Sequence, residues 1–486
     1  MKMAQGRILC WDESVIEKND GAQILMHRPE RKNIALKCDD IWEGPHCGYG
    51  RVIKVDDTYR LYYRASDYVQ RFDDSVSPNH AVLCVAESRD GINFEKINVG
   101  KHDFNGSVCN NIIYERKEMP FDNFSVFYDD NPNCPEDERF KALSEYNPDG
   151  KPRLIYYASA DGYDFREMYE IGVKGSFDSY NVMLWDSKTE QYFMFYRAFH
   201  TKEGEDRFWW EFEPKIDWVN DIRDIRVATS KDFRSWTEHG RIRFDEGKED
   251  YPLYINNVMK YYRAESTFVG FPLRYSDRAA DKRNFDHMPQ AYRHRAVTEK
   301  MGREGTALTD NIFMTSKDGF NFDRRDEAFI TQGPENMSNW WYGGSSMVYG
   351  LIETPSEYWG APNEISLFLT ENYRIKNIEF RRYTLRLDGF FSWFGGYDGA
   401  TVLTKPLVVE GDALKVNFAT SAAGGMTVTL CDADGRELDG YSSYVMFGDS
   451  TDRTVEFDRP LGDIRGERVR LKITLCDAHL YSFIFE

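Results

Sequence analysis

Short runs of apolar, β-branched and aromatic residues recur along the chain, and a similar polar turn follows several of them. Each turn begins Ser-x-Asp, three of the four continue with Gly, and an aromatic residue stands six positions after the Ser. Ser and Asp side chains can hydrogen-bond to turn backbone, and Gly accepts the positive φ of a tight turn. The pattern predicts a strand, a tight turn and a second strand. The four copies are Ser88–Phe94, Ser159–Phe165, Ser230–Trp236 and Ser316–Phe322.

The spacing of these turns indicates a repeat architecture. Successive copies begin about 70 to 86 residues apart, and a worn fifth copy with one extra residue runs from Arg386 to Trp393. Further strand candidates precede each turn, such as Tyr49–Val55 and Tyr59–Arg64 in the first unit. Four strands per unit, repeated five times, predict an all-β fold with a five-bladed β-propeller.

The same pattern divides the chain into three parts. Residues 1–40 are expected to form a lead-in packed on the propeller, and residues 41–398 to form the five blades. Alternating strands after residue 401, such as Leu414–Ala419, predict a C-terminal β-sandwich over 401–486. Two insertions interrupt the regular spacing of the predicted strands, namely Thr201–Asn220 and Ser276–Gly305. They are expected to form loops on one face of the propeller.

Charge and composition narrow the class of function. The 486 residues carry a formal net charge of −19 without a basic stripe, which argues against nucleic acid and anionic membranes as partners. The eight cysteines lack zinc-site spacing, so buried free thiols are expected. The N-terminus lacks the apolar core of a signal peptide and no run is long enough to span a membrane. We expect a cytoplasmic monomer or small homo-oligomer, and the sequence predicts no cofactor and no metal site.

A five-bladed propeller followed by a β-sandwich resembles the furanosidase superfamily of glycoside hydrolases, which includes invertase-like, inulinase-like and arabinanase-like enzymes. The turn Ser230–Trp236 is similar to turns in their blades. The resemblance implies a glycoside hydrolase acting on an oligosaccharide or glycoside, for example a fructoside or an arabinoside. It also implies three carboxylates in an axial funnel, one near the start of the innermost strand in each of the first three blades. The invertase signature is absent, because Gly44 replaces the Asp before Pro45 in Trp42–Gly48.

Glycoside cleavage generally needs two carboxyl groups that flank the bond, and one of them must stay protonated at working pH. Acids near the starts of blades are therefore the candidates, with a turn cap or an arginine partner as the structural alternative for each. Asp129 is the obvious competitor of its neighbour Asp130. The predicted catalytic residues are Glu43, Asp130, Asp178 and Glu335.

Aromatic faces beside hydrogen-bonding groups are what a sugar site requires. The segment around Trp340 has this composition, and a packed aromatic corner is the alternative interpretation. The arginines could either orient a catalytic carboxylate or form structural ion pairs. The predicted substrate-binding residues are Trp42, Asp129, Asn181, Arg223, Asn256, Arg274, Trp340, Trp341 and Tyr342.

Three other functions stay open. A phosphate-dependent glycoside phosphorylase would need one catalytic acid and a cationic cluster, to which His46, Arg223 and Arg274 could contribute. A sialidase-like enzyme would need three clustered arginines and a Tyr–Glu pair. A non-catalytic carbohydrate-binding propeller is favoured by the missing signatures, although the polar acids and aromatics at the blade starts argue against it. Dinucleotide, Walker and zinc-protease motifs are absent from the sequence.

Overall fold

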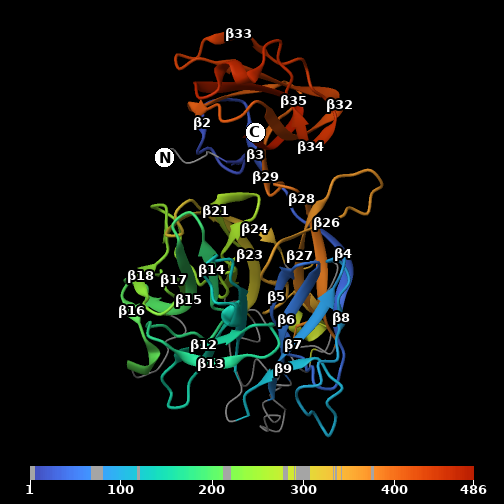
Figure 1. Cartoon of the computed structure of the whole chain (residues 1–486). Helices are drawn as coiled ribbons and strands as arrows, with labels where there is room; N and C mark the ends of the chain where they lie inside the picture. Colours follow the sequence, from blue (N-terminus) through green and yellow to red (C-terminus); the bar gives the residue numbers. More distant parts are fainter. Residues whose placement is uncertain are drawn as a thin grey trace.

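Five sheets follow one another around a central axis, and a sixth sheet stands at one end of the propeller in this computed structural model (Figure 1). The protein is all-β, as the sequence predicts. The helices whose bounds the structure describes are short 3-10 turns: η1 (Glu136–Glu138), η2 (Trp209–Glu211), η3 (Arg283–His287), η5 (Met337–Asn339) and η6 (Leu461–Ile464). The structure describes residues 6–66, 80–117, 121–211, 221–276, 283–288, 291, 307–331, 333, 337–340, 342–373 and 377–486.

The first three blades are antiparallel sheets whose strands follow the order of the chain. Blade one contains β5 (Gly48–Val55), β6 (Thr58–Ser66), β7 (Ala81–Ser88) and β8 (Glu95–Lys96), and β9 (Ile112–Glu115) also pairs with β7. Blade two contains β10 (Phe124–Tyr128), β11 (Phe140–Tyr146), β12 (Arg153–Ser159) and β13 (Arg166–Ile171). Blade three contains β14 (Val182–Asp186), β15 (Gln191–Thr201), β17 (Asp221–Ser230) and β18 (Thr237–Arg241), with β16 (Asp206–Arg207) on β15.

Blades four and five have split inner strands. Blade four contains β20 (Met259–Tyr261), β21 (Ala264–Gly270), β23 (Leu308–Ser316) and β24 (Asn321–Ile330), with β22 (Leu273–Ser276) on β23 and β19 (Arg243–Phe244) on β24. Blade five contains β25 (Ser346–Met347), β26 (Ile352–Thr354), β27 (Glu364–Glu371) and β28 (Ile378–Arg386), and its fourth strand is β4 (Glu30–Cys38).

The recurring Ser-x-Asp turns join the third and fourth strands of blades one to four. In blade one, Ser88 Oγ donates to Asp90 Oδ1 at 2.8 Å and accepts from the Gly91 N–H at 2.9 Å. Asp90 Oδ1 also accepts from two further backbone N–H groups. The other three turns repeat the carboxylate bonds, and in blade three Phe233 takes the positive φ of 62° that Gly takes elsewhere. The same local hydrogen-bond pattern therefore marks the turn between the third and fourth strands in each of blades one to four.

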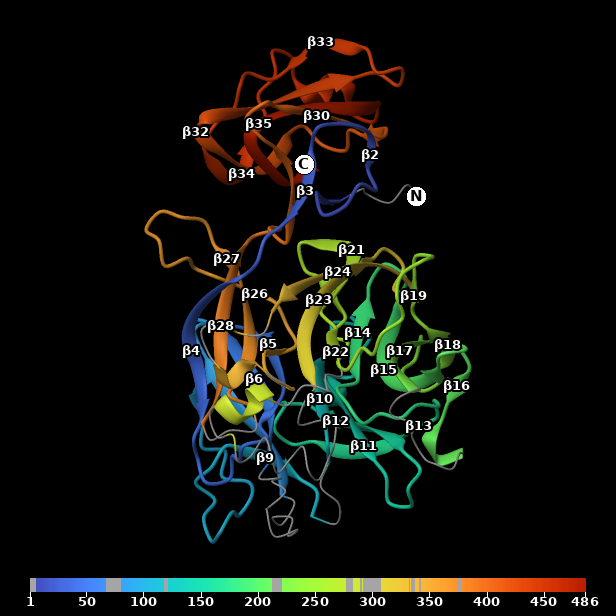
Figure 2. The same ribbon diagram turned by 180° about the vertical axis from the view of Figure 1, so that it is seen from behind.

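The propeller is closed by the N-terminal strand β4, which pairs antiparallel with β28 from Cys38↔Ile378 to Glu30↔Thr384. Figure 2 shows this blue strand beside the orange strands of blade five. Residues from β4, blade one and blade five share one apolar cluster that includes Leu36 and Phe380. The segment expected as a lead-in thus supplies a blade strand, because the chain that follows β28 leaves the propeller.

The C-terminal module is one ten-stranded sheet dominated by two 18-residue strands, β32 (Leu414–Cys431) and β35 (Arg468–Phe485). Their register shifts between Thr420 and Gly425, and the sheet bends over a core of its own, as in a β-sandwich. Its other strands are β29 (Phe391–Gly395), β30 (Ala400–Thr404), β31 (Leu407–Val408), β33 (Glu437–Ser442) and β34 (Asp449–Thr454), together with the N-terminal β1 (Ile8–Leu9), β2 (Ile16–Asp20) and β3 (Gln23–Met26).

The less regular fifth copy of the turn, Arg386–Trp393, lies where the chain passes from the propeller to the C-terminal sheet. Asp388 has a φ of 59° and is fully buried, and the strand after it, β29, belongs to the C-terminal sheet. Arg263 Nε lies 2.8 Å from Asp388 Oδ1, and Ser482 Oγ donates to Asp388 Oδ2 at 2.6 Å. Burial opposes ionisation, but Arg263 and Arg7 hold the pKa of Asp388 below its usual value. The buried aspartate therefore connects blade four with both ends of the chain.

The cysteines and helices add two findings. All eight cysteines are free; Cys109 is exposed, Cys476 is partly exposed and the others are buried. In the part of the chain that the structure describes, none of the helices has the length and apolar character needed to cross a membrane.

Candidate functional site

A small recess opens where the innermost strands of the propeller begin. Its walls come from blade one, blade four and blade five, and they are largely aromatic. Such a mixture of rings and a few polar groups is typical of small-ligand sites. The lining residues are Gly48, Tyr49, Arg64, Tyr254, Ile255, Leu273, Tyr342, Gly343, Ser346, Thr370 and Tyr373.

Blade two contributes Asp122, two residues before β10. Arg64 Nη1 from the recess wall lies 2.8 Å from Asp122 Oδ1 and also donates to the Asp122 carbonyl at 2.6 Å. The side chain of Asp122 is 39% exposed, although many atoms surround it and its Oδ2 is buried. Burial raises the pKa of Asp122, Arg64 opposes the rise, and the nearby Asp178 adds to it.

Blade three contributes Asp178, four residues before β14. Arg197 Nη1 lies 3.2 Å from Asp178 Oδ1, and the Arg197 guanidinium stands 4.8 Å above the Tyr254 ring that lines the recess. The Asp178 side chain is 40% exposed, whereas Arg197 is buried. A buried arginine thus holds an accessible carboxylate at the mouth of the axis.

The third carboxyl group is Glu145, near the end of β11. Burial raises the pKa of Glu145 well above its usual value, and the negative charges of Asp122 and Asp178 raise it further, while Arg116 opposes the rise. Glu145 is partly exposed, and the direction of this shift means that it keeps its proton to a higher pH than an unperturbed glutamate. The three acids come from two adjacent blades and form one electrostatic cluster.

The backbone that carries these acids is fixed by buried amides. Asn181 Nδ2 donates to the carbonyls of Phe177 and Ser179, and its Oδ1 accepts from the Arg197 N–H. Asn123 Nδ2 also donates to the Phe177 carbonyl, at 2.9 Å. The loops of blades two and three are therefore joined, and Asn181 serves as a support for Asp178.

Unusual backbone geometry gathers at the same end of the axis. Four non-glycine residues with positive φ lie at blade starts, namely Tyr49 (48°), Phe177 (53°), Asn257 (43°) and Ser345 (60°). Such conformations cost free energy and cluster at functional sites. They support the recess as the candidate site.

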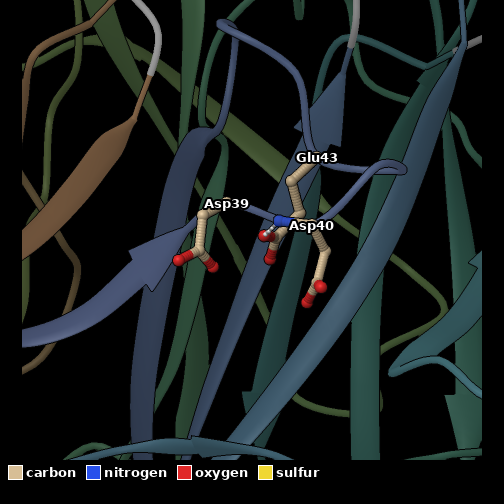
Figure 3. Close-up of side chains that lie close together, drawn as sticks. All are labelled: Asp39, Asp40 and Glu43. Atoms are coloured by element: carbon tan, nitrogen blue, oxygen red, sulfur yellow. Dashed lines mark hydrogen bonds between the residues drawn. The ribbon is translucent and has the colours of Figure 1, made fainter.

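The structure places Glu43 elsewhere, in the wedge between blades one and five. Its Oε1 accepts from the Tyr63 hydroxyl and its Oε2 lies 2.7 Å from Lys96 Nζ. Asp39 and Asp40 join it at the turn after β4, as Figure 3 shows. The Lys96 ammonium lies 2.9 Å from Asp39 and 2.8 Å from Asp40, so a cationic side chain already neutralises this cluster. Burial raises the pKa of Glu43, which Lys96 opposes.

Asp129 and Asp130 follow β10, whereas Asp122 precedes it, so they lie at the opposite end of that strand. Asp129 is fully buried, accepts from the Tyr192 hydroxyl at 2.8 Å and lies 3.2 Å from Lys141 Nζ, which gives it a structural role. Asp130 is exposed to solvent on one side, while protein atoms surround the rest of its carboxyl group. This partial burial and the charge of Asp129 raise the pKa of Asp130, and Arg51 opposes the rise.

The proposed substrate-binding residues divide between the recess and structural positions. Tyr342 lines the recess, and Arg223 stands 5.6 Å from the Tyr254 ring. Arg274 instead makes a bidentate ion pair with Asp310 at 2.9 and 2.7 Å. Asn256 donates to two blade-three carbonyls.

Of the tryptophans predicted to bind substrate, the two that the structure describes lie away from the recess. Trp42 packs between blades one and five and donates to Asn111. Trp340 is exposed, and its indole N–H donates to the Gly333 carbonyl. Glu335 and Trp341 lie outside the described residues, as do residues 212–220 of the first insertion and most of the second.

Sequence reasoning passed over Asp122 and Glu145, although a signal for the first was present. Phe121-Asp122-Asn123-Phe124 and Phe177-Asp178-Ser179-Tyr180 share an aromatic-Asp-x-aromatic pattern at the starts of successive blades. Asp178 occupies this position in blade three, and Asp122, not Asp130, occupies it in blade two. Glu145 lies inside a strand, and nothing in its local sequence distinguishes it.

Comparisons with known proteins give matches among solved structures. A thermostable family-43 glycoside hydrolase matches with 12% identity and a TM-score of 0.41, over 74% of this chain and 96% of its own. A Bombyx mori GH32 β-fructofuranosidase matches with 9% identity and a TM-score of 0.39, over 95% and 94%. A structure described under the GH130 family of mannoside phosphorylases, which contains hydrolases of β-1,2 mannosidic linkages, matches with 14% identity and a TM-score of 0.39, over 74% and 94%. No protein-family model and no curated protein matches the sequence.

Proposed function

We propose that this protein is a glycoside hydrolase that cleaves its substrate in the axial recess. The observation that supports the proposal most strongly is the electrostatic cluster of Asp122, Glu145 and Asp178 at the start of the inner strands. Glycosidases need one carboxyl group that stays protonated and another that is ionised, and different surroundings must separate the two. Burial acts on Glu145, whereas Arg197 provides a positive partner for Asp178.

The proposed roles follow from these surroundings. Glu145 donates a proton to the oxygen of the leaving group, because its raised pKa keeps the proton in place. Asp178 acts from the accessible side, either on water as a general base or on the anomeric carbon as a nucleophile. Asp122, bound by Arg64, keeps negative charge beside Glu145 and orients the sugar. Of the acids named from the sequence, Asp178 keeps its catalytic role in this proposal.

The proposed substrate is a glycoside with a terminal furanose, such as a fructoside or an arabinoside. The tyrosines of the recess, Tyr49, Tyr254, Tyr342 and Tyr373, offer rings for stacking and hydroxyl groups for hydrogen bonds.

The test is a hydrolysis screen of the purified protein against aryl furanosides, aryl pyranosides, fructans, arabinans and mannosides, with and without phosphate. Release of free sugar without phosphate, lost in Asp178→Asn, would support the proposal. Binding of the same sugars in calorimetry without any turnover would instead identify a carbohydrate-binding propeller.

A phosphate-dependent phosphorylase is the second candidate, because basic groups also reach the recess. Arg64 Nη2 lies 3.3 Å from His46 Nδ1, and the His46 ring stacks on Tyr373 at 5.0 Å. A phosphorylase binds inorganic phosphate beside the sugar and needs only one catalytic acid. Formation of a sugar 1-phosphate only in the presence of phosphate would favour this candidate over hydrolysis.

A further inference from the structure

The axial channel contains a buried arginine that the proposed catalysis does not use. Arg51 lies on β5 and is 7% exposed. Its guanidinium stands 4.1 Å from the Tyr349 ring and 5.6 Å from the Phe127 ring, on the inner sides of blades five and two. Inner-strand backbones also meet here, since the Val52 N–H donates to the Tyr349 carbonyl at 2.9 Å. Arg51 therefore points toward the axis of the propeller, between blades two and five.

The charge of Arg51 has no ion-pair partner within the part of the chain that the structure describes. Its Nε and Nη1 are buried there without a hydrogen-bond acceptor. Asp130 is the acid whose pKa responds to Arg51, but Asp130 is exposed and forms no ion pair with it among the described residues. Buried guanidinium N–H groups without an acceptor, such as those at Nε and Nη1, are costly, and an arginine cannot relieve the cost by losing its proton.

Two further donors face the same space. Ser125 Oγ and Tyr180 Oη are buried and make no hydrogen bond among the described residues. Ser125 is two positions from Phe127 on β10, so both side chains leave the strand on one face. The Tyr180 ring lies 6.5 Å from the Tyr349 ring. Burial raises the pKa of Tyr180 to about 12, and two neighbours oppose the rise: Arg51, and the Ser125 hydroxyl, which approaches Tyr180 without the geometry of a regular hydrogen bond.

We propose that a small monovalent anion, chloride in ordinary buffers, binds in the channel between the Arg51 guanidinium, the Ser125 hydroxyl and the Tyr180 hydroxyl. Arginine N–H groups can only donate, and both hydroxyls can turn their hydrogens inward, so these groups require an acceptor. An anion accepts from all of them and supplies the missing negative charge, whereas a water molecule would leave the positive charge uncompensated. A cation is excluded from this position by Arg51.

The proposed anion site adjoins the recess through Tyr180. Tyr180 stacks on Tyr49 with ring centres 5.7 Å apart, and Tyr49 lines the recess. Tyr180 is also two residues from Asp178 in the chain. The inference does not depend on the proposed hydrolysis, because it concerns binding alone.

The experiment measures chloride binding to the full-length protein by the broadening of the ³⁵Cl NMR line. In parallel, the unfolding temperature is recorded as chloride replaces gluconate at constant ionic strength. The wild type is expected to broaden the line and to gain stability with increasing chloride, because a ligand that binds the folded state stabilises it. Arg51→Met is expected to lose both responses.

Arg324→Met is the matched control, because Arg324 is also buried but donates to Asp326 and to the Glu249 carbonyl. This variant should keep the chloride response. If Arg51→Met fails to fold, Ser125→Ala and Tyr180→Phe remove one donor each and should weaken chloride binding several-fold. A wild type without line broadening, or an Arg51→Met protein that responds like the wild type, would overturn the proposal.

Discussion

Arg197 and Asp178 form the contact around which the candidate site is organised, with Arg197 Nη1 3.2 Å from Asp178 Oδ1. The arginine is buried and the aspartate is 40% exposed on its side chain. The backbone of Arg197 also accepts from the N–H groups of Ser176 and Phe177, so the loop that carries Asp178 is bound to the same residue. The pair joins a rigid strand to an accessible carboxylate.

We expect Asp178→Asn to abolish turnover and to leave the fold intact. The amide keeps the size of the side chain but can act neither as a base nor as a nucleophile, and losses of this kind reach at least about 10²–10⁴-fold. Activity on the substrate found in the hydrolysis screen measures the effect, and circular dichroism verifies the fold. Asp130→Asn is the matched control and should retain activity, because Asp130 lies at the other end of β10. Full activity in a folded Asp178→Asn protein would remove Asp178 from the site.

Glu145 should determine the alkaline side of the pH profile. Burial, together with Asp122 and Asp178, raises its pKa well above the usual value, so the protonated form persists to higher pH. Activity that needs this proton should be lost as the pH rises through the raised pKa. The measurement is kcat/KM against pH. In Glu145→Gln the alkaline limb should disappear together with most of the activity, and an unchanged alkaline limb would assign the proton donor to another group.

The Ser-x-Asp turns should contribute stability that depends on pH. Burial opposes the change, but the backbone N–H groups of Asn93 and Ile92 lower the pKa of Asp90 from 3.8 to about 2. A lowered pKa stabilises the fold above the unfolded value near 4, and this stability is lost as the pH falls toward 2. After allowance for solvent screening, we expect Asp90→Asn to lower the unfolding free energy by about 1 kcal/mol at pH 7.

Thermal unfolding of wild type and Asp90→Asn at pH 7 and near pH 2 measures this contribution. The two proteins should differ at pH 7 and converge at low pH, where the wild-type carboxylate is protonated. A difference of the same size at both values would mean that the charge of Asp90 is not the cause.

Closure of the propeller by β4 should be sensitive to a cavity. Leu36 is 5% exposed and packs with residues of blades one and five. Leu36→Ala should lower stability by about 2–5 kcal/mol, the usual cost of removing a buried leucine side chain. Lys37→Ala is the control on the same strand, because Lys37 is exposed and should change stability by less than about 0.5 kcal/mol. Denaturant unfolding compares the two, and equal effects would show that burial of Leu36 does not hold the blade.

The repeated turns illustrate what could be predicted from the sequence. Ser88, Asp90 and Gly91 satisfy one another within four residues, so their bonds are determined locally and can be read without knowledge of the rest of the chain. Their spacing then predicts the strands and the five blades. Because this spacing also locates the start of each blade, Asp178 could be assigned to the start of an inner strand.

Tertiary structure alone decided which acids meet. Glu145 becomes a candidate acid only because folding partly buries it and brings the charges of Asp122 and Asp178 close enough to raise its pKa. Glu43 has the right residue type near the right blade, yet Lys96 from β8 binds it in another wedge. The pairing of β4 with β28 also joins segments about 350 residues apart. Adjacent residues determine the local hydrogen bonds of the turns. Burial, charge partners and blade closure depend on residues that only folding brings together.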